Sequence, residues 1–558
     1  MKRIALALSA LYSTLAWSQV AIPPGLEPGQ VERELRQLHA PERVPEDLAP
    51  PAPEQAAPPQ SAGLKFVLRH VHIEGASVYP EADLAQPFAA LLGHELTVVQ
   101  VFQIANQLTA RYRRDGYILS QVLVPAQNIT DGELRLVAVE GFVDAVQLRG
   151  DVPPGESLLA GYGERMKRVR PLTAAALERC LLLMNDVGGS RARGTLVPSA
   201  KTPGAAELVV DFTRERTHID LTSNNRNSRS LGPYRSGIDA TASGLIGDWD
   251  QLGLTGGSSL DSEFNFVGLT YGANLGSNGV RWTAGATAVR SKPGPAANLT
   301  ATDLKTESIS GLLRIDVPLI RSRTTNVSLR GTLTSFDGQS EFSLASISDD
   351  RIRAARLGVT FDHADHLRGI STIDFEVAHG FDGFGARTQG TADSPLSRIN
   401  GRVDFTKASL YAARLQALGG SWSALGALTV QQAFNPLLAS ELFAFGGDLF
   451  GRGYDAAELV GDSGEACKFE LRYAGAVPQA GVGAYSMYGF FDAGRVRRRD
   501  PINEAASEHA ASAGAGIRLT STGSRWQGLL EVAKPLDHDV AAEGNRKVRF
   551  FVGFQVNL

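Results

Sequence analysis

The sequence predicts two small α+β domains followed by a transmembrane antiparallel β-barrel, with a signal peptide and a short helix ahead of them. From residue 216 to residue 558, segments of about ten residues alternate apolar and polar side chains between turns rich in glycine and serine. Before them, the order strand, helix, helix, strand, strand occurs twice, in units of about 75 residues. After the N-terminus the sequence has no run of about twenty apolar residues, so it contains no candidate membrane-spanning helix.

Composition and the N-terminus limit the possible functions. The chain has 558 residues, a formal net charge of -4 and no block of basic residues, so we expect no nucleic-acid partner. Its first residues combine Lys2-Arg3, an apolar stretch from Ile4 to Leu15, and Ala16-Trp17-Ser18. This combination is typical of a secretory signal peptide, which we place at residues 1–18. The mature protein is therefore expected outside the cytoplasm.

A short amphipathic helix and a tether follow the signal peptide. Within residues 19–39, Val31, Leu35 and Leu38 share one helical stripe, but so short a helix needs a docking surface to persist. Residues 40–63 are rich in proline and alanine, which indicates an extended linker. Together they predict a plug helix on a tether. The alternative is a disordered leader without a role.

Residues 64–141 form the first predicted α+β unit. A strand is expected from Phe66 to Gly75 and a helix from Glu81 to Leu92. The capping box Thr97–Gln100 begins a second helix, which Gly116 ends, and two β-rich segments follow.

The second predicted unit, residues 142–215, repeats this order more faintly. Thr173 caps a helix that carries Cys180 on its apolar face. Cys180 is expected to be a buried core residue rather than a reactive thiol.

The alternation in residues 216–558 gives each strand one polar and one apolar face. At the C-terminus the apolar row consists of Val548, Phe550, Val552, Phe554, Val556 and Leu558. A barrel with a polar lumen gives charged side chains water and leaves no open sheet edge in hydrocarbon. A soluble β-sandwich is the alternative, and the charges on alternate positions argue against its dry core.

One arginine is singled out by its position in a glycine-rich loop near residues 445–466. The loop contains Arg452-Gly453-Tyr454, in which Arg452 lies between Gly451 and Gly453. Downstream, Asp492 lies on the strand face opposite an apolar row that includes Phe491. If that row meets lipid, Asp492 points into the lumen, where Arg452 can pair with it. The alternative is a surface arginine in a flexible loop and an aspartate in a turn.

These segments resemble two motifs of the POTRA-plus-barrel outer-membrane superfamily. Arg452-Gly453-Tyr454 resembles the motif of its long sixth surface loop, and Phe491-Asp492-Ala493-Gly494 resembles its Phe-Asp-x-Gly strand motif. The resemblance implies that the loop folds into the barrel and that its arginine contacts a lumen partner motif formed by Phe491, Asp492 and Gly494. Gly451 departs from the hydrophobic residue that usually precedes the arginine.

Nearly the whole mature chain resembles the two-partner secretion transporters (TpsB; the ShlB/FhaC/HecB-like haemolysin secretion/activation family). In the first α+β unit the resemblance rests on Tyr112-x-x-x-Gly116-Tyr117-Ile118 and on residues 124–134, and at the barrel entry on residues 223–252. The family barrel has sixteen strands, which suits about 340 residues at about 21 residues per strand and turn. Leu558 departs from the usual final aromatic residue.

The resemblance implies an outer-membrane translocator of a Gram-negative bacterium. Its periplasmic POTRA domains would bind the N-terminal secretion domain of an unfolded, TpsA-like β-helical exoprotein, and the barrel would pass the exoprotein outward. Further implied partners are outer-membrane lipid, lipopolysaccharide and, during biogenesis, the barrel-assembly machinery. The alternatives are an outer-membrane insertase, which commonly carries more POTRA domains, and a porin-like channel, which needs neither these domains nor the Arg452 loop.

Three segments imitate catalytic or cofactor sites. Gly461-Asp462-Ser463-Gly464 copies the nucleophile sequence of trypsin-like proteases, but a triad needs a double-barrel fold and this tetrapeptide follows the Arg452 loop. Asp362-His363-Ala364-Asp365-His366 alternates across a strand, so its side chains do not converge on a metal. Gly514-Ala515-Gly516 has no following helix, unlike a nucleotide fingerprint. We therefore expect no catalytic site, no cofactor and no metal, and no enzyme activity.

Overall fold

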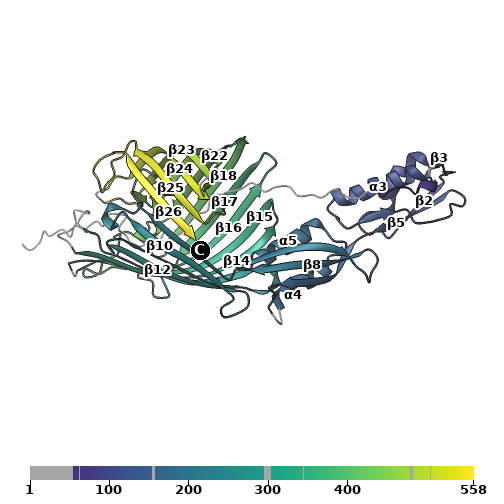
Figure 1. Cartoon of the computed structure of the whole chain (residues 1–558). Coiled ribbons are helices and arrows are strands. Elements are labelled where there is room, and N and C mark those ends of the chain that lie inside the picture. The colour runs from purple at the N-terminus through teal and green to yellow at the C-terminus, as the bar shows by residue number, and fades with distance from the viewer. Residues whose placement is uncertain are drawn as a thin grey trace, which may run out of the picture.

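The computed structural model describes residues 30, 55–61, 63–153, 157–294, 303–343, 345–477, 482–502 and 504–558. The barrel, the second α+β domain and the first α+β domain follow one another along an elongated molecule (Figure 1). The predicted signal peptide and the plug residues Val31, Leu35 and Leu38 lie outside the described residues. Of the helices in the described ranges, none has both the length and the apolar character needed to cross a membrane.

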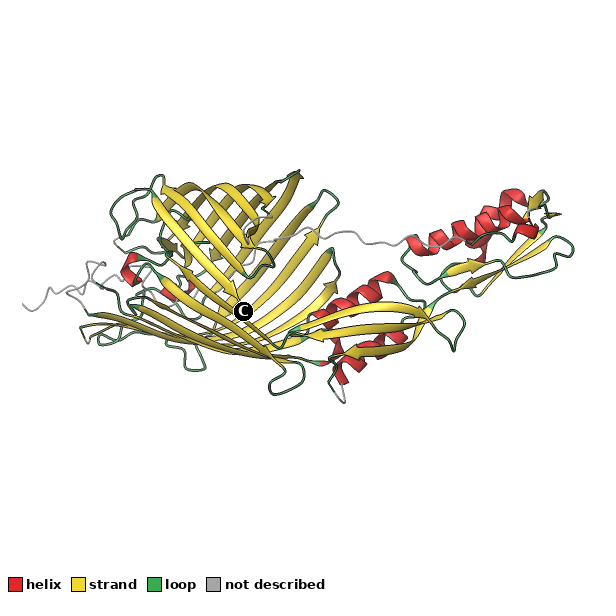
Figure 2. Ribbon diagram, viewed as in Figure 1, coloured by secondary structure: helices red, strands yellow, loops and turns green. Residues whose placement is uncertain are grey.

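Sixteen antiparallel strands close into a barrel, which confirms the predicted architecture and strand number (Figure 2). Each strand pairs with the next barrel strand along the chain, and the last pairs with the first. The barrel strands are β9 (Thr217–Asn224), β10 (Arg235–Ser243), β11 (Asp250–Ser259), β12 (Phe264–Asn274), β13 (Arg281–Ser291), β14 (Leu304–Arg321), β15 (Thr325–Phe342), β16 (Ala345–Ala364), β17 (Gly369–Gly380), β18 (Thr406–Gly419), β19 (Trp422–Ala433), β22 (Ser463–Ala476), β23 (Val482–Arg497), β24 (Ser507–Ser521), β25 (Trp526–Pro535) and β26 (Arg549–Asn557).

The alternating pattern determines which side chains face outward. Leu333 and Phe375 are exposed on the outer face, whereas Arg330 and Asp374, each at the opposite parity of its strand, pair across the inner face at 3.0 Å. Charged groups therefore meet one another inside the barrel, and apolar groups form the outer surface.

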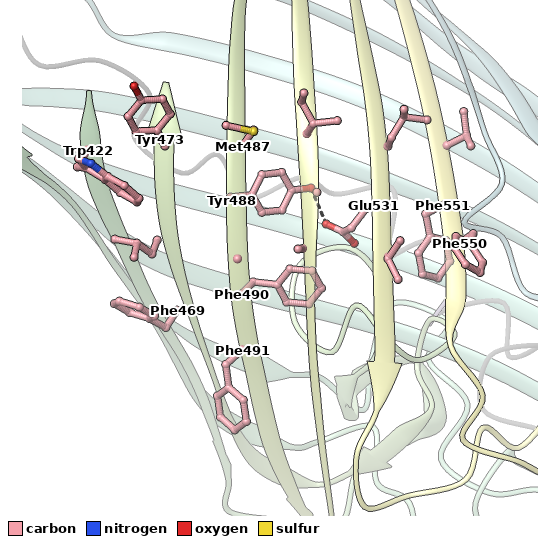
Figure 3. Close-up of a pocket in the computed structure, with 18 residues that line it drawn as sticks. Trp422, Phe469, Tyr473, Met487, Tyr488, Phe490, Phe491, Glu531, Phe550 and Phe551 are labelled. Atoms are coloured by element: carbon pink, nitrogen blue, oxygen red, sulfur yellow. Dashed lines mark hydrogen bonds between the residues drawn. The ribbon is translucent and has the colours of Figure 1, made fainter. Parts of the chain in front are cut away.

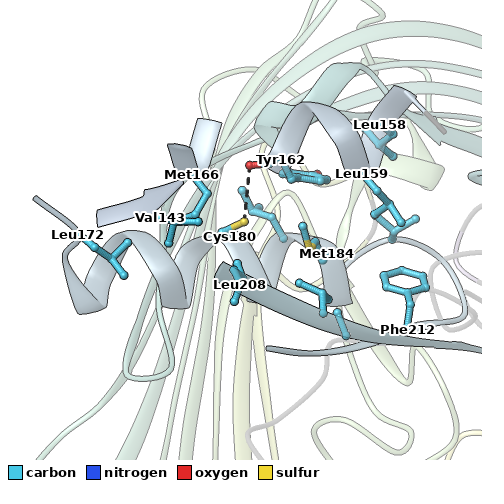
Figure 4. Close-up of a cluster of buried hydrophobic side chains, with 14 residues drawn as sticks. Val143, Leu158, Leu159, Tyr162, Met166, Leu172, Cys180, Met184, Leu208 and Phe212 are labelled. Atoms are coloured by element: carbon cyan, nitrogen blue, oxygen red, sulfur yellow. Dashed lines mark hydrogen bonds between the residues drawn. The ribbon is translucent and has the colours of Figure 1, made fainter. Parts of the chain in front are cut away.

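The second α+β domain is a three-stranded sheet covered by two helices. The sheet order is β6 (Phe142–Gly150), β8 (Ala205–Arg214), β7 (Ser190–Pro198), and the helices are α4 (Ser157–Lys167) and α5 (Ala174–Asn185). As predicted, Thr173 caps α5 by accepting a hydrogen bond from the Ala176 N–H at 3.2 Å. Cys180 lies in the core between the helices and the sheet (Figure 4), and burial raises the pKa of its thiol to about 11. An inert core residue is what the sequence predicted.

This domain packs against the end of the barrel where β14 ends and β11 begins. Arg321, at the end of β14, forms an ion pair with Asp186 at 2.7 Å, and Arg179 donates to the Pro318 carbonyl at 2.9 Å. Phe212 of β8 packs edge-on against Trp249 with ring centroids 5.6 Å apart. Charged and aromatic contacts thus connect the domain to two different barrel turns.

The first α+β domain has the same layout with one extra strand pair. Its sheet order is β2 (His70–Glu74), β5 (Glu133–Val139), β4 (Gln121–Leu123), and β1 (Lys65–Val67) pairs separately with β3 (Glu95–Thr97). Its helices are α2 (Glu81–Ala85), η3 (Gln86–Leu91) and α3 (Val98–Arg114), and the predicted capping box begins α3.

Two elements of the first domain differ from the sequence prediction. The single strand expected from Phe66 to Gly75 is split, because the Leu68 and Arg69 N–H groups donate to His94 and Gly132 rather than to one partner strand. The helix expected from Glu81 to Leu92 is an α-helix only to Ala85 and then a 3₁₀ helix. Pro87 near its start lacks the N–H that would continue the α-helical ladder.

Candidate functional site

A long loop between β19 and β22, residues 434–462, packs against the inner wall of the barrel. It contains η7 (Ala439–Glu441) and a two-stranded sheet of β20 (Phe443–Phe445) and β21 (Leu459–Gly461) that is separate from the barrel sheet. Phe445 is fully buried, and Phe450 packs on Tyr411 of β18. The loop both begins and ends earlier than the predicted 445–466, because Ser463 already belongs to β22.

Arg452 attaches this loop to β22 and β23. Its Nε and Nη2 donate to the two oxygens of Asp492 at 2.9 and 2.6 Å, and its Nη1 donates to Glu470 at 2.5 Å. The Arg452 N–H adds a bond to Asp492 at 3.0 Å. Arg452 is 3% exposed and Asp492 is 0% exposed, so the structure brings together, in a buried site, the two residues whose pairing the sequence indicated. Two parallel charge-assisted bonds fix both the position and the plane of the guanidinium.

Phe490, rather than Phe491, supplies the aromatic partner of the arginine. The guanidinium carbon of Arg452 lies 3.7 Å from the centroid of the Phe490 ring, a cation–π contact. Phe491 is 45% exposed on the outer face and does not join the site. The inclusion of Phe491 in the lumen partner motif was therefore wrong, because a strand directs the neighbour of Asp492 to the opposite side.

Two glycines give the loop room to reach its position. Gly494 faces the lumen, and a Cβ there would lie 2.2 Å from a ring carbon of Phe445. Gly451 has a φ of +87°, and its Cβ would also meet the Phe445 ring, at 2.8 Å. A hydrophobic residue before the arginine would be strained here, which explains the departure from the usual motif.

The rest of the Arg-Gly-Tyr motif contacts β24 and the turn after β25. The Gly453 N–H donates to Ser512 Oγ at 3.2 Å, and Tyr454 Oη donates to the Ala511 carbonyl at 2.8 Å. A Cβ on Gly453 would lie 2.7 Å from the Ser512 Cβ. Arg452, Gly453 and Tyr454 therefore attach the loop to three consecutive strands.

Four further residues of the cluster, Arg226, Glu470, Tyr488 and Glu531, were not identified from the sequence. Arg226, in the connection between β9 and β10, forms an ion pair with Asp448 of the loop at 2.6 Å and another with the buried Glu531 of β25. Tyr488 donates to the same Glu531 at 2.6 Å (Figure 3). Glu470 and Glu531 follow the polar parity of their strands and both approach Arg452, at 2.5 and 3.9 Å. Their convergence on Arg452 depends on strand register, which the sequence does not reveal.

Gln30, the one described residue before residue 55, is buried against the loop of residues 434–462. Its side chain is 4% exposed and donates to the Ala439 carbonyl at 2.6 Å and to the Leu442 carbonyl at 3.4 Å. Glu441 lies between Ala439 and Leu442 along the chain. It forms ion pairs with Arg356 of β16 at 2.5 Å and with Lys407 of β18 at 2.7 Å, both on the barrel wall. Gln30 thus docks on a part of the loop that the wall holds in place.

The protease-like tetrapeptide has a structural explanation. Asp462 is fully buried and accepts hydrogen bonds from the Arg398 guanidinium at 2.7 Å, the Leu437 N–H at 2.7 Å and the Arg499 N–H at 2.8 Å. Its carboxylate therefore organises three loops. Within the described ranges, no three His, Cys, Asp or Glu side chains gather as a metal site would require.

Comparison with known proteins explains this combination of two α+β domains, a sixteen-stranded barrel and an inward loop. The family model "Haemolysin secretion/activation protein ShlB/FhaC/HecB" matches residues 206–519, and the model "POTRA domain, ShlB-type" matches residues 66–141. The chain belongs to the ShlB/FhaC/HecB family. It is an outer-membrane transporter of the two-partner secretion type, with its POTRA domains in the periplasm.

Individual relatives agree with this assignment. The heme/hemopexin transporter protein HuxB of Haemophilus influenzae is 23% identical over 86% of this chain and 85% of its own. The outer membrane transporter CdiB of Dickeya dadantii is 24% identical over 73% and 72%. The solved structure of CdiB from Escherichia coli matches with a TM-score of 0.71 at 18% identity, over 91% of this chain and 93% of that one. CdiB from Acinetobacter baumannii matches with 0.61 at 17% identity, over 95% of each chain. The family match does not favour the insertase or porin alternatives.

Proposed function

We propose that this transporter moves a large, unfolded exoprotein from the periplasm through the barrel lumen to the cell surface. The observation that supports this most is the loop of residues 434–462, which packs inside the barrel without joining its sheet. Side-chain groups, chiefly Arg452 on Asp492, hold it there. Such a loop can move while the sixteen strands stay paired, so a path can open inside a closed barrel.

Capture begins at the POTRA sheets. The sheet orders leave β4 at one edge of the first domain and β7 at one edge of the second. An edge strand offers main-chain N–H and C=O groups to a further strand, so it binds extended polypeptide with little regard to side chains. The partner is the N-terminal secretion domain of the exoprotein, held unfolded while it binds.

The N-terminal helix acts as a plug in the resting state. Residues 19–39 carry the stripe Val31, Leu35 and Leu38, and the one described residue of this region, Gln30, is buried against the loop inside the barrel. Exit of this helix and of the loop is required for transport.

The remaining partners follow from the surface of the barrel. Its apolar outer face, with residues such as Leu333 and Phe375, contacts outer-membrane lipid and lipopolysaccharide. The C-terminal strand β26 is the part that the barrel-assembly machinery reads during biogenesis.

Secretion in a heterologous Gram-negative host tests the proposal. The chain is expressed with each large β-helical exoprotein encoded in the same genome, and the exoprotein in the medium is quantified. One exoprotein should appear in the medium only when the chain is present. If none does while small solutes cross the outer membrane freely, the chain is a porin-like channel and the proposal is wrong.

A further inference from the structure

An apolar groove of about 1270 Å³ runs along the outer face of the barrel, on the strands that hold Arg452 from inside (Figure 3). Phe469 of β22 and Phe550 of β26 lie on either side of it, and each is more than half exposed on the lipid-facing side. Its floor includes Gly489 of β23 and Ala515 of β24, which are cross-strand partners. The groove therefore exists because the smallest side chains lie between large aromatic ones.

No group of the described residues fills the space over Gly489. A Cβ built there would meet no atom closer than 4.0 Å, and its φ lies outside the left-handed region, so a larger residue would fit. Glycine weakens a strand, and it often marks a place where a ligand approaches the backbone closely. The groove has room for a linear hydrocarbon chain.

Two cations lie at the outer end of the groove. Arg495 of β23 and Lys534 of β25 have the lipid-facing parity of their strands, and both are exposed. Neither forms an ion pair with a carboxylate of the described residues, and Arg495 donates to Ser507 Oγ at 2.9 Å. The neighbouring Glu465 is already paired with Arg497 at 2.6 Å. Two positive charges above the groove thus have no carboxylate to neutralise them.

The spacing along β23 places Arg495 at the outer membrane surface. Near the periplasmic end, the Tyr473 ring packs against Trp422 and Tyr485 with centroids 5.0 and 6.4 Å apart, and such an aromatic girdle marks the membrane–water interface. Arg495 follows Tyr485 by ten residues on the same strand. At about 3.3 Å per residue and a tilt of about 40° these residues rise about 25 Å, the height of the apolar band of an outer-membrane barrel.

We propose that this groove binds one molecule of lipopolysaccharide through its lipid A, a phosphorylated glycolipid with several acyl chains. The cations lie at the end of the barrel opposite the POTRA domains, so they face the outer leaflet. Arginine and lysine both bind phosphate, and here they lie directly above an apolar channel for an acyl chain. The site rests on the outer-membrane location of the barrel rather than on transport. It turns the general contact with lipopolysaccharide into one bound molecule.

The bound lipid lies on the part of the wall that anchors the inward loop. Asp492, the partner of Arg452, directly follows Phe491 of the groove on β23. Inside the barrel, a Cβ on Gly453 would lie 3.2 Å from the carbonyl carbon of Lys534. The same strands therefore carry the lipid outside and the loop inside, so lipid A stabilises the wall on which the loop docks.

Native mass spectrometry of the whole transporter tests the charged part of the site. Delipidated protein in detergent is titrated with diphosphoryl lipid A, and the affinity for the first bound molecule is measured. Arg495→Gln with Lys534→Gln should weaken it at least about tenfold, because two cations that face the phosphates are lost. The matched control is Arg290→Gln with Lys292→Gln. It removes two cations from the same rim that are already paired with carboxylates, at 2.7 and 3.1 Å, and it should bind like the parent.

A second set of variants tests the groove. Gly489→Leu fills the space over the floor and should weaken lipid A binding at least about threefold, because the acyl chain loses its van der Waals contacts there. Ala515→Val, a smaller addition to the same floor, should act in the same direction. The matched control is Gly331→Leu on β15, where a Cβ also meets no atom within 4 Å but the groove is distant. It should bind lipid A like the parent.

Phosphatidylglycerol, an anionic phospholipid with one phosphate, should bind the parent at least about tenfold more weakly than lipid A. Equal affinity for the two lipids would make the groove a general phospholipid site and overturn the proposal. Parent-like binding by the charge variant, or by both groove variants, would overturn it as well. No exoprotein takes part in these measurements, so failure of the lipid site and failure of the proposed transport are distinguishable.

Discussion

Replacing Arg452 with alanine should release the loop of residues 434–462 while the barrel stays intact. The change leaves Asp492, which is 0% exposed, without its guanidinium partner. Removing one member of a buried ion pair costs about 3–5 kcal/mol, whereas a water-filled lumen would reduce this to roughly 1–2. The burial of both residues favours the larger range. A cost of about 3 kcal/mol lowers the ratio of docked to released loop by roughly 100-fold.

Thiol labelling measures this ratio. A cysteine is introduced at Ala456, a half-buried loop position, in a Cys467→Ser background, since Cys467 is exposed and Cys180 is buried. Its labelling rate by a bulky maleimide follows the population of released loop. The rate should rise strongly in Arg452→Ala. The matched control is Arg472→Ala, because Arg472 also donates to Glu470, at 2.7 Å, but from the wall rather than from the loop.

The barrel itself should survive the substitution. Arg452→Ala should insert normally, remain heat-modifiable on gels and yet secrete poorly, because the loop no longer holds its working position. Asp492→Ala should behave alike, and the double variant should be little worse than either single variant, since both remove one interaction. A labelling rate within roughly threefold of the parent would show that Arg452 does not restrain the loop. Loss of the inserted barrel would give Arg452 a role in folding instead.

Three other outcomes are expected. Deleting residues 20–38 should increase single-channel conductance in planar bilayers, and unchanged conductance and opening frequency would contradict a plug. A fragment of residues 64–215 should be soluble and bind the N-terminal region of the exoprotein in calorimetry; if the folded fragment fails to bind at micromolar concentration, recognition lies in the barrel. Burial alone would raise the pKa of Glu140, but hydrogen bonds from Ser77, Val78 and Tyr112 hold it below 4.5. The first POTRA domain should therefore lose stability as the pH falls below 4.5, and Glu140→Gln should flatten that dependence in thermal melts.

Alternation made the barrel predictable, because lipid on one side and water on the other impose a period of two that survives in the sequence. The same period placed Asp492 on the lumen side and made its pairing with Arg452 a hypothesis. The same alternation requires Phe491 to face outward. The family motif nevertheless led us to count Phe491 among the lumen residues.

The rest of the site depends on facts that are not local in sequence. Glu470 and Glu531 reach Arg452 only because of the register of β22, β23 and β25, and Arg226 enters from a loop more than 200 residues away. Pattern alone cannot supply such register. In the first POTRA domain, apolar periodicity predicted one strand where a change of hydrogen-bond partner at Leu68 divides it into β1 and β2. It also predicted one α-helix where Pro87 ends α2 and the 3₁₀ helix η3 follows.

Photocrosslinking of cargo in transit tests most directly whether the exoprotein passes through the lumen. Leu312 and Leu313 are neighbours on β14 that face opposite sides, and Leu313 is exposed on the outer face. A photoreactive phenylalanine analogue is placed at either position while a folded C-terminal fusion stalls the exoprotein in the transporter. The cargo should crosslink from position 312 and not from position 313. Crosslinks from position 313 alone, or from neither position in a transporter that secretes normally, would contradict passage through the barrel.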